Sequence, residues 1–398
     1  MSADDLVQRV LQDNPSIEAM RAAADAAHAD IESAGALDDP MLSYAAAPRT
    51  AGGPRQGLNQ NVQISQTLPW PGTLRLRTRA ASANAASADA DIQDLRLRLS
   101  ARARAAYAQW FYVHRALRIN AENQSLVKRL HGVAETSYAS GQSPQQDVLQ
   151  AQVEQVRLRN QALELERLQR TVQAQINALQ NRPADTPVAE PKGLPKARAL
   201  PKYASLRDAA LSRYPKLQSL DALIDASQDR LALARKNRYP HFKLMAGYNS
   251  LWDAPDKRLM VGVSINIPFG ANHSGEISTA RARVRQAQAT LVDARSRLLG
   301  NLDQAYATVE QARSSIQLYR DQLLPLARLN LQAAEADYSN GTGDFLKLIT
   351  AERQYLAVQL ELARTRADFY TQWASLNYQT GGALDALPIS VTIQDTAR

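Results

Sequence analysis

The chain has 398 residues, a formal net charge of +8 and no cysteine. The missing cysteines exclude disulfides and thiolate metal sites. Arginine is interleaved with aspartate and glutamate, which favours a solvated helical surface over nucleic-acid binding. No apolar run reaches the roughly 18 residues of a membrane-spanning helix. The sequence starts Met1-Ser-Ala-Asp-Asp5 without a hydrophobic leader, so we expect either a cytosolic protein or a mature form whose export signal was removed.

The first pattern along the chain is helical. Residues 4–36 are alanine-rich, carry Asn14-Pro15 near their start and predict one helix. Residues 203–237 predict a second such helix, with Tyr214-Pro215 at an offset of 200 positions. Each pattern runs up to a proline, Pro40 or Pro240, and an extended stretch follows.

These extended stretches predict two β-hairpins, over residues 41–68 and 241–267. Apolar and small or polar residues alternate there with the period of two that is typical of strands, most clearly from Met260 to Ile267. The predicted strands are about ten residues long. They stop at Pro69 and Pro268, because proline cannot donate to a strand ladder. The adjacent Trp70 and Phe269 fit either core packing or an aromatic belt at a membrane surface.

Long helices follow each hairpin, over residues 73–137 and 276–338, each about 95 Å long at 1.5 Å per residue. Their apolar residues fall on seven-residue grids, which predicts coiled-coil packing. Asn120 interrupts the first grid, and we expect Pro325 to kink the second helix. Shorter helices return over residues 144–180 and 344–378, where Arg353 interrupts an otherwise apolar heptad position.

The two turns between the long and the returning helices are alike. Tyr138, Gly141 and Ala151 recur at Tyr338, Gly341 and Ala351, each 200 positions later. Both glycines can adopt the left-handed conformation that ends a helix, and Ser143 or Asp344 can cap the next one. We therefore expect two repeats, residues 1–181 and 203–381. A proline-rich linker (182–202) joins them, and a tail (382–398) follows.

The predicted strands require more than one chain. Four strands are too few for a closed barrel, which begins near eight. An open sheet would expose its edges, and in a bilayer each unpaired backbone group costs several kcal/mol. The sequence therefore predicts a barrel shared among at least two copies.

Taken together, these features resemble the outer-membrane factors of bacterial efflux systems, the TolC family. The resemblance covers nearly the whole chain. Within the family, the segments Ala34-Gly-Ala-Leu-Asp-Asp-Pro40 and Ser65-Gln-Thr-Leu-Pro-Trp-Pro-Gly-Thr-Leu-Arg-Leu-Arg77 are similar to the heavy-metal efflux branch. The resemblance implies a mostly α fold with β-hairpins, in which coiled-coil helices form an α-barrel in the periplasm. It also implies a homotrimer with a shared twelve-stranded β-barrel in the outer-membrane lipid.

The resemblance further implies partners and site residues. A periplasmic adaptor protein would dock on the two turns and link the tunnel to an inner-membrane pump of the RND class. The residues implied in docking are Tyr138, Ser140, Gly141, Ser143, Tyr338, Asn340, Gly341, Thr342 and Gly343. The alternative is that these turns only reverse the chain. Trp70 and Phe269 would lie at the periplasmic edge of the barrel, with residues 49–56 and 251–257 facing outside.

The tunnel gate is less well defined by sequence. Family members can close the tunnel with acidic residues just after the second turn, where this chain has Lys347 and Thr350. Asp147 and Asp344 could supply charge at the constriction instead, or simply stabilise a helix N-terminus.

No enzyme and no cofactor are expected. The five histidines, at positions 28, 114, 131, 241 and 273, form no i,i+4 pair and no cluster with carboxylates, so no metal site is predicted. Phosphate-loop, nucleophile-elbow and zinc-protease motifs are missing. We therefore predict a passive exit duct for heavy-metal cations. A duct for drugs or other organic molecules is the first alternative, and a soluble coiled-coil scaffold is the second.

Overall fold

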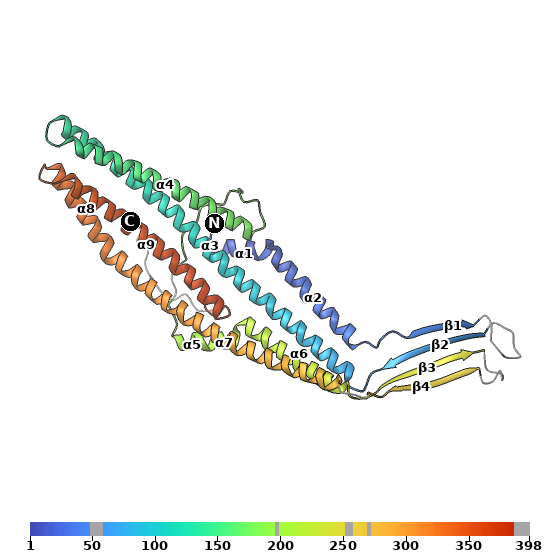
Figure 1. Cartoon of the computed structure of the whole chain (residues 1–398). Helices are drawn as coiled ribbons and strands as arrows, with labels where there is room; N and C mark the ends of the chain where they lie inside the picture. The colour runs from blue at the N-terminus through green and yellow to red at the C-terminus, as the bar shows by residue number, and fades with distance from the viewer. Residues whose placement is uncertain (48–58, 196–198, 251–257, 269–271, 386–398) are drawn as a thin grey trace. The chain divides into compact units, whose positions relative to one another are not determined.

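The computed structural model of the chain describes residues 1–47, 59–195, 199–250, 258–268 and 272–385 (Figure 1). This part of the chain is mostly helical and contains one four-stranded sheet, as the sequence predicts. It divides into two compact units. We call residues 19–92 and 215–295 the sheet unit, and residues 1–18, 93–214 and 296–398 the helical unit.

The sheet unit carries both β-hairpins. Strands β1 (Met41–Ala47), β2 (Asn59–Leu68), β3 (His241–Asn249) and β4 (Leu259–Asn266) pair antiparallel in that order. Pairing between β2 and β3, from Asn61 opposite Asn249 to Leu68 opposite Phe242, joins the two halves of the chain. The strands are 7, 10, 9 and 8 residues long, close to the expected ten.

Helices of the sheet unit flank the strands in sequence. They are most of α2 (Pro15–Gly35), α6 (Pro215–Lys236), and the first parts of α3 (Thr73–Ala139) and α7 (Asn272–Leu318). Ser87 of α3 and Ser219 of α6 share a buried hydrogen bond of 3.0 Å. Lys216 of α6 and Asp91 of α3 form an ion pair of 2.9 Å. These contacts hold α6 against α3.

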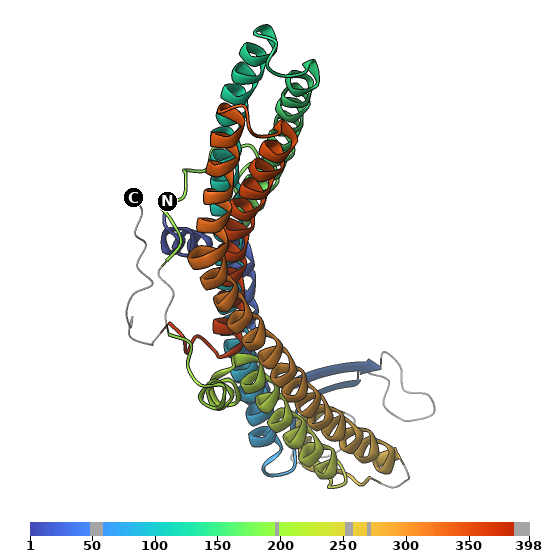
Figure 2. The same ribbon diagram turned by 90° about the vertical axis from the view of Figure 1, so that its left-hand side faces the viewer.

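The helical unit is built around two long hairpins (Figure 2). The first pairs α3 with α4 (Gln145–Leu179), and the second pairs α8 (Leu324–Ser339) with α9 (Phe345–Gln379). The short helices α1 (Ala3–Asp13) and α5 (Tyr203–Arg213) belong to the same unit. Apolar residues from both hairpins share two cores, one of which contains Ile119, Leu158 and Leu356.

Two expected helices are each broken in two. The sequence pattern predicts single helices over residues 4–36 and 203–237, but the backbone is extended at Asn14 (ψ 118°) and at Tyr214 (ψ 114°). Both residues precede a proline, whose ring disfavours the helical conformation of the residue before it. The single-helix prediction was therefore wrong at both places, and the break belongs to the Asn14-Pro15 and Tyr214-Pro215 pairs.

The irregularity expected at Pro325 takes a defined form. Residues Tyr319–Leu323 form one π-helical turn, designated η2, between α7 and α8. The amide of Leu324 donates to the carbonyl of Tyr319, five residues earlier. A proline lacks the amide hydrogen and crowds the preceding turn, and a π-bulge is one way for a helix to accommodate it.

The linker between the halves is fixed to the helical unit over part of its length. Tyr107 of α3 donates to the carbonyl of Gly193 at 2.7 Å, and the indole of Trp110 donates to that of Ala189 at 3.1 Å. Asn177 of α4 donates to the carbonyl of Thr186 at 2.8 Å.

Within the described ranges, no helix has an apolar stretch of the length and hydropathy required to span a membrane.

Candidate functional site

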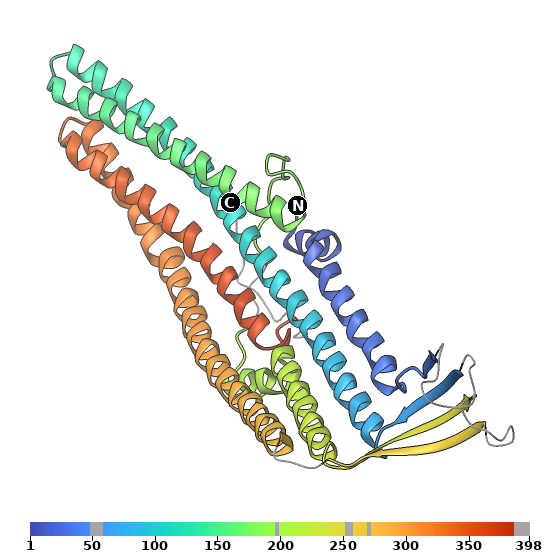
Figure 3. The same ribbon diagram turned by 45° about the vertical axis from the view of Figure 1, so that its right-hand side comes forward.

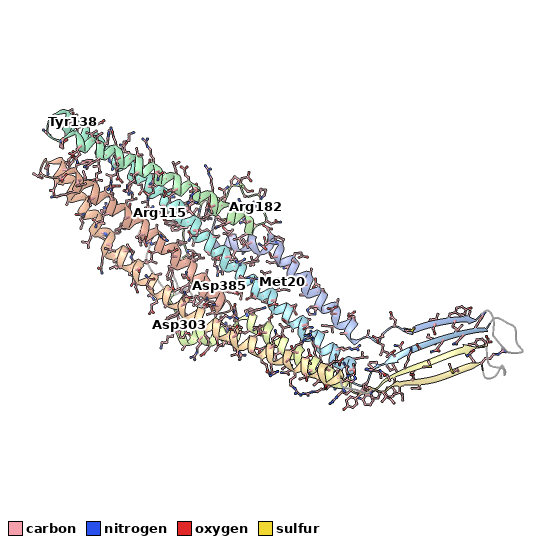
Figure 4. The ribbon with its side chains drawn as sticks, in the orientation of Figure 1. Met20, Arg115, Tyr138, Arg182, Asp303 and Asp385 are labelled. Carbon is pink, nitrogen blue, oxygen red and sulfur yellow. The ribbon has the colours of Figure 1, made fainter. Side chains whose placement is uncertain are left out.

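The first turn ends α3 with a backbone motif that requires a left-handed residue. Gly141 has φ of +75°, its amide donates to the carbonyl of Tyr138, and the amide of Gln142 reaches back to Ser137 at 2.8 Å. This pair of bonds is a Schellman motif, which satisfies the free carbonyls at a helix end. Figure 4 labels Tyr138 at this end of the α3–α4 hairpin.

The second turn repeats the motif at the end of α8. Gly341 has φ of +73°, its amide donates to Tyr338, and the amide of Thr342 donates to Asp337 at 3.0 Å. Ser140, Asn340 and Thr342 are exposed at the two turns, as are both glycines. Gly343 is confined by backbone, since a Cβ atom there would lie 2.7 Å from the amide nitrogen of Tyr338.

The helices that follow the turns start differently. Asp344 caps α9, because its carboxylate accepts a hydrogen bond from the amide of Leu346 at 2.9 Å. Helix α4 begins after Pro144, which provides no side-chain cap. The prediction that Ser143 caps α4 was therefore wrong, since that helix starts one residue later and the buried Ser143 hydroxyl has no hydrogen-bond partner of good geometry.

Tyr138 and Tyr338 occupy equivalent places in the sequence but differ in their surroundings. Tyr138 is 47% exposed, whereas Tyr338 is 9% exposed and packs edge-on against Phe345, with 5.1 Å between the ring centroids. The hydroxyl of Tyr338 donates to Oδ2 of the buried Asp147 at 3.1 Å, which ties α8 to α4. The structure thus connects a docking candidate of the second turn to a gate candidate of the first.

Electrostatics at this contact oppose ionisation of Asp147. Burial raises the pKa of the Asp147 carboxyl, the hydrogen bond from Tyr338 lowers it, and the charge of Asp344 raises it again. Lys347 and Thr350 lie on the exposed side of α9, and the Thr350 hydroxyl donates to the carbonyl of Leu346. The structure therefore brings Asp147 together with Tyr338 and leaves Lys347 facing outward in a single chain.

The helices that follow the two turns, α4 and α9, carry a cluster of buried charged residues that was not predicted from the sequence. Glu154 of α4 is fully buried, and its two oxygens each hold one arginine: Arg157 Nη2 at 2.6 Å and Arg353 Nη2 at 2.7 Å. Glu352 of α9 is also fully buried, and neither of its oxygens has a hydrogen-bond partner. The only sequence signal was Arg353, a charge at an otherwise apolar heptad position.

Trp70 belongs to an aromatic stack in the sheet unit. Its ring lies 4.9 Å from that of Tyr239 and 6.0 Å from that of Phe242, nearly parallel to both. From the sequence, Phe242 is predicted only as a strand residue and Tyr239 is not singled out, although Tyr239 lies two residues before β3 and Phe242 is its second residue. Phe269, the other predicted interface aromatic, lies outside the described residues, as do the predicted outer loops at 49–56 and 251–257.

The sheet exposes its apolar face. The four strands lie side by side in one sheet (Figure 3). The side chains that share this face, in register across the four strands, are Leu42, Tyr44, Val62, Ile64, Leu244, Tyr248, Leu259, Val261, Val263 and Ile265, and all are exposed. On the opposite face, Asn61 and Gln63 are half-buried and Ser65 is buried. Soluble antiparallel sheets show the reverse arrangement, with the apolar face against the core.

Within the described residues, no group of three or more histidine, cysteine, aspartate or glutamate side chains is placed to hold an ion.

Comparison with known proteins identifies the family. Residues 6–182 match the outer membrane efflux protein family, and residues 206–382 match it a second time. The chain belongs to this family. The two matched segments are offset by 200 positions, the same offset that relates the two turns.

Two curated relatives of this efflux family member differ in what their names describe. The chain is 25% identical over 217 residues to the cobalt-zinc-cadmium resistance protein CzcC of Cupriavidus metallidurans, covering 54% of this chain and 51% of CzcC. It is 23% identical over 188 residues to the alkaline protease secretion protein AprF of Pseudomonas aeruginosa, covering 45% of this chain and 39% of AprF. Each alignment spans about half of its relative or less.

The fold of this family member resembles that of a solved outer-membrane protein over nearly its whole length. The outer membrane protein VceC of Vibrio cholerae superposes with a TM-score of 0.82 at 19% identity, covering 96% of both chains. The predicted mostly helical fold with four strands is thereby confirmed, and the shared barrel stays a prediction.

Proposed function

We propose that the chain is one protomer of an outer-membrane exit duct, which conducts substrates passively from the periplasm to the cell exterior. The observation that carries this proposal is the sheet that exposes apolar side chains of all four strands on one face, while β2 places Asn61, Gln63 and Ser65 on the other. Strands that line a water-filled barrel in a bilayer alternate in this way, apolar towards lipid and polar towards the lumen.

The two edges of the sheet support assembly with further copies. Strands β1 and β4 each pair on one side only within the described chain. Unpaired strand edges are strongly unfavourable in a bilayer, and closure removes them. We propose a homotrimer, in which three four-stranded sheets form a twelve-stranded barrel. The Trp70 stack with Tyr239 then lies at the periplasmic membrane surface, where aromatic side chains are enriched.

The helical unit supplies the proposed tunnel and its contacts. We propose that the exposed residues of the two turns, among them Tyr138, Ser140, Asn340 and Thr342, dock on a periplasmic adaptor that leads to an inner-membrane RND pump. Asp147, Asp344 and Lys347 are the proposed gate residues, and the Tyr338–Asp147 hydrogen bond supports a role of Asp147 in holding the two hairpins together.

Membrane fractionation and mass determination test the duct. We expect the protein in the outer-membrane fraction, a trimeric mass in detergent, and pores in a planar lipid bilayer. A monodisperse product that is soluble without detergent and forms no pores would instead support the coiled-coil scaffold.

Heavy-metal cations are the proposed cargo, supported by the similarity to CzcC and by the short motifs around Pro40 and Trp70. The similarity to AprF favours a second candidate, an exit duct for a secreted protein. Growth of the host with and without the gene, on zinc, cobalt, cadmium, nickel, copper and silver salts and on dyes and antibiotics, separates these possibilities. Metal sensitivity of the host without the gene, relieved when the gene is returned, supports the metal duct. Sensitivity of that host to organic compounds alone would replace it with a drug duct. Loss of a secreted protein from the medium would favour the second candidate.

A further inference from the structure

The contact between α4 and α9 contains two fully buried carboxyl groups with unequal partners. Glu154 on α4 has an arginine on each oxygen, Arg157 from its own helix and Arg353 from α9. Glu352 on α9 has no hydrogen-bond partner on either oxygen. A buried carboxylate without hydrogen bonds is costly, whereas the same group in its neutral form is tolerated more easily.

The charges that act on Glu352 are few. Glu154 and Arg157 act from α4, and Arg353 acts from α9 itself. The neighbouring core also contains Leu130 of α3 and Leu331 of α8, together with Ile349 and Ala351. Leu130 and Leu331 contribute apolar side chains to that core, and the charges that shift Glu352 come from Glu154, Arg157 and Arg353. The local balance is therefore set by two carboxyl groups and two arginines.

We propose that Glu352 is a proton-operated lock in the α4–α9 contact: the neutral carboxyl group keeps the two helices together, and its ionisation loosens them. The lock connects the hairpin α3–α4 to the hairpin α8–α9, on the helices that also carry the Asp147 and Asp344 gate candidates. Its consequence for conduction, wider opening of the tunnel at higher periplasmic pH, rests on the proposed duct function.

The direction of the effect follows from the environment. Burial, and then the charge of Glu154, raise the pKa of Glu352 from 4.5 to about 7, against the opposing effects of Arg157 and Arg353. The packed contact therefore binds a proton that the separated helices release. It is most stable below about pH 4.5, loses stability as the pH rises to about 7, and stays weakest above that. One pKa unit corresponds to about a tenfold change in equilibrium constant, so we expect opening to increase by about 100-fold or more over this window.

Amide hydrogen exchange of the full-length protein in detergent tests the lock directly. Peptides from the first three turns of α4 and α9 are compared between wild type and Glu352→Gln, at about pH 5 and about pH 8. Because both proteins have the same intrinsic exchange rates, the comparison removes the chemical effect of pH. We expect the ratio of exchange rates, wild type over variant, to rise about 10-fold or more between the two pH values. Glu361→Gln, an exposed glutamate on the same helix, should leave the ratio near one at both.

A flat ratio for Glu352→Gln would overturn the lock. If that variant does not fold, Glu352→Met provides the same comparison with an uncharged side chain of similar size. Conductance in planar bilayers then tests the link to the tunnel. We expect greater conductance at the higher pH for wild type and no pH dependence for the variant. A pH-dependent exchange ratio with pH-independent conductance would overturn the link alone. A wild-type protein that forms no pore would overturn the duct itself, and the exchange comparison would still decide on the lock.

Discussion

The hydroxyl of Tyr338 donates to the carboxylate of Asp147 across 191 positions of sequence, and this bond joins the two hairpins close to their turns. The equivalent residue of the first turn, Tyr138, is exposed. Two turns with nearly the same sequence pattern therefore have different roles, one contacting its neighbour and the other facing outward.

Replacing Tyr338 by phenylalanine removes the donor and leaves a buried carboxylate behind. We expect a loss of about 1–3 kcal/mol in the free energy of unfolding, because an unsatisfied buried acceptor costs its full desolvation. The pKa of Asp147 should rise further, since the hydrogen bond that lowers it is gone. The added destabilisation should therefore grow as the pH rises through the pKa range of this carboxyl group and vanish in acid. Tyr138→Phe is the matched control, and urea unfolding at several pH values is the measurement; equal effects of both substitutions would contradict the proposed difference.

A charge on the apolar face of β4 should interfere with insertion into the membrane. Val261 is 88% exposed on that face, and its neighbour Met260 points to the opposite one. We expect Val261→Lys to reduce the stability of the protein in the membrane by about 1–4 kcal/mol, and to reduce the amount of trimer recovered from outer membranes. Met260→Lys should be recovered at close to the wild-type level, and a similar loss for both would argue against the assignment of the faces.

Removing one arginine from Glu154 should weaken the α4–α9 contact. Arg353→Gln leaves the fully buried Glu154 with Arg157 alone. Because the Arg353 side chain is half-exposed and its charge is partly screened by solvent, we expect the free energy of unfolding to fall by about 1–3 kcal/mol, less than for a wholly buried ion pair. Arg364→Gln, which removes a long 3.8 Å pair with Asp368 on the surface of α9, should change the unfolding free energy by less than about 0.5 kcal/mol. The measurement is the urea midpoint of unfolding of each variant. An unchanged midpoint for Arg353→Gln would show that the Glu154–Arg353 ion pair contributes nothing to stability.

Opposite effects are expected from two glycine substitutions. Gly341→Ala meets no atoms but must adopt a positive φ of +73°, so a loss of about 1–2 kcal/mol is expected. Gly132→Ala lies inside α3, also in open space, and should raise stability by about 0.5–1 kcal/mol. Thermal unfolding measures both, and a stabilising Gly341→Ala would contradict the Schellman motif at the second turn.

Local patterns made most of the fold predictable. The strands follow from the alternation around Val261, and the turns follow from Gly141 and Gly341, since each depends on neighbours in sequence. The breaks at Asn14 and Tyr214 were visible as residues before proline, but the helical periodicity on both sides was given more weight.

The candidate site was only partly predictable, because it depends on which helix faces meet. Sequence placed Tyr338 and Asp147 separately, and only the packing of α8 against α4 brings them together. Glu352 is an ordinary glutamate in sequence, like the exposed Glu361 on the same helix. Its burial is a property of the contact with α4, which no spacing along a single helix specifies.

The two open edges of the sheet have a genetic consequence. In a barrel closed by neighbouring copies, each edge is satisfied only by another chain, so a protomer with a damaged β1 or β4 would also deprive the intact copies beside it. A defective allele expressed together with the normal gene should then be dominant, because one protomer with a damaged edge strand prevents the whole mixed barrel from closing.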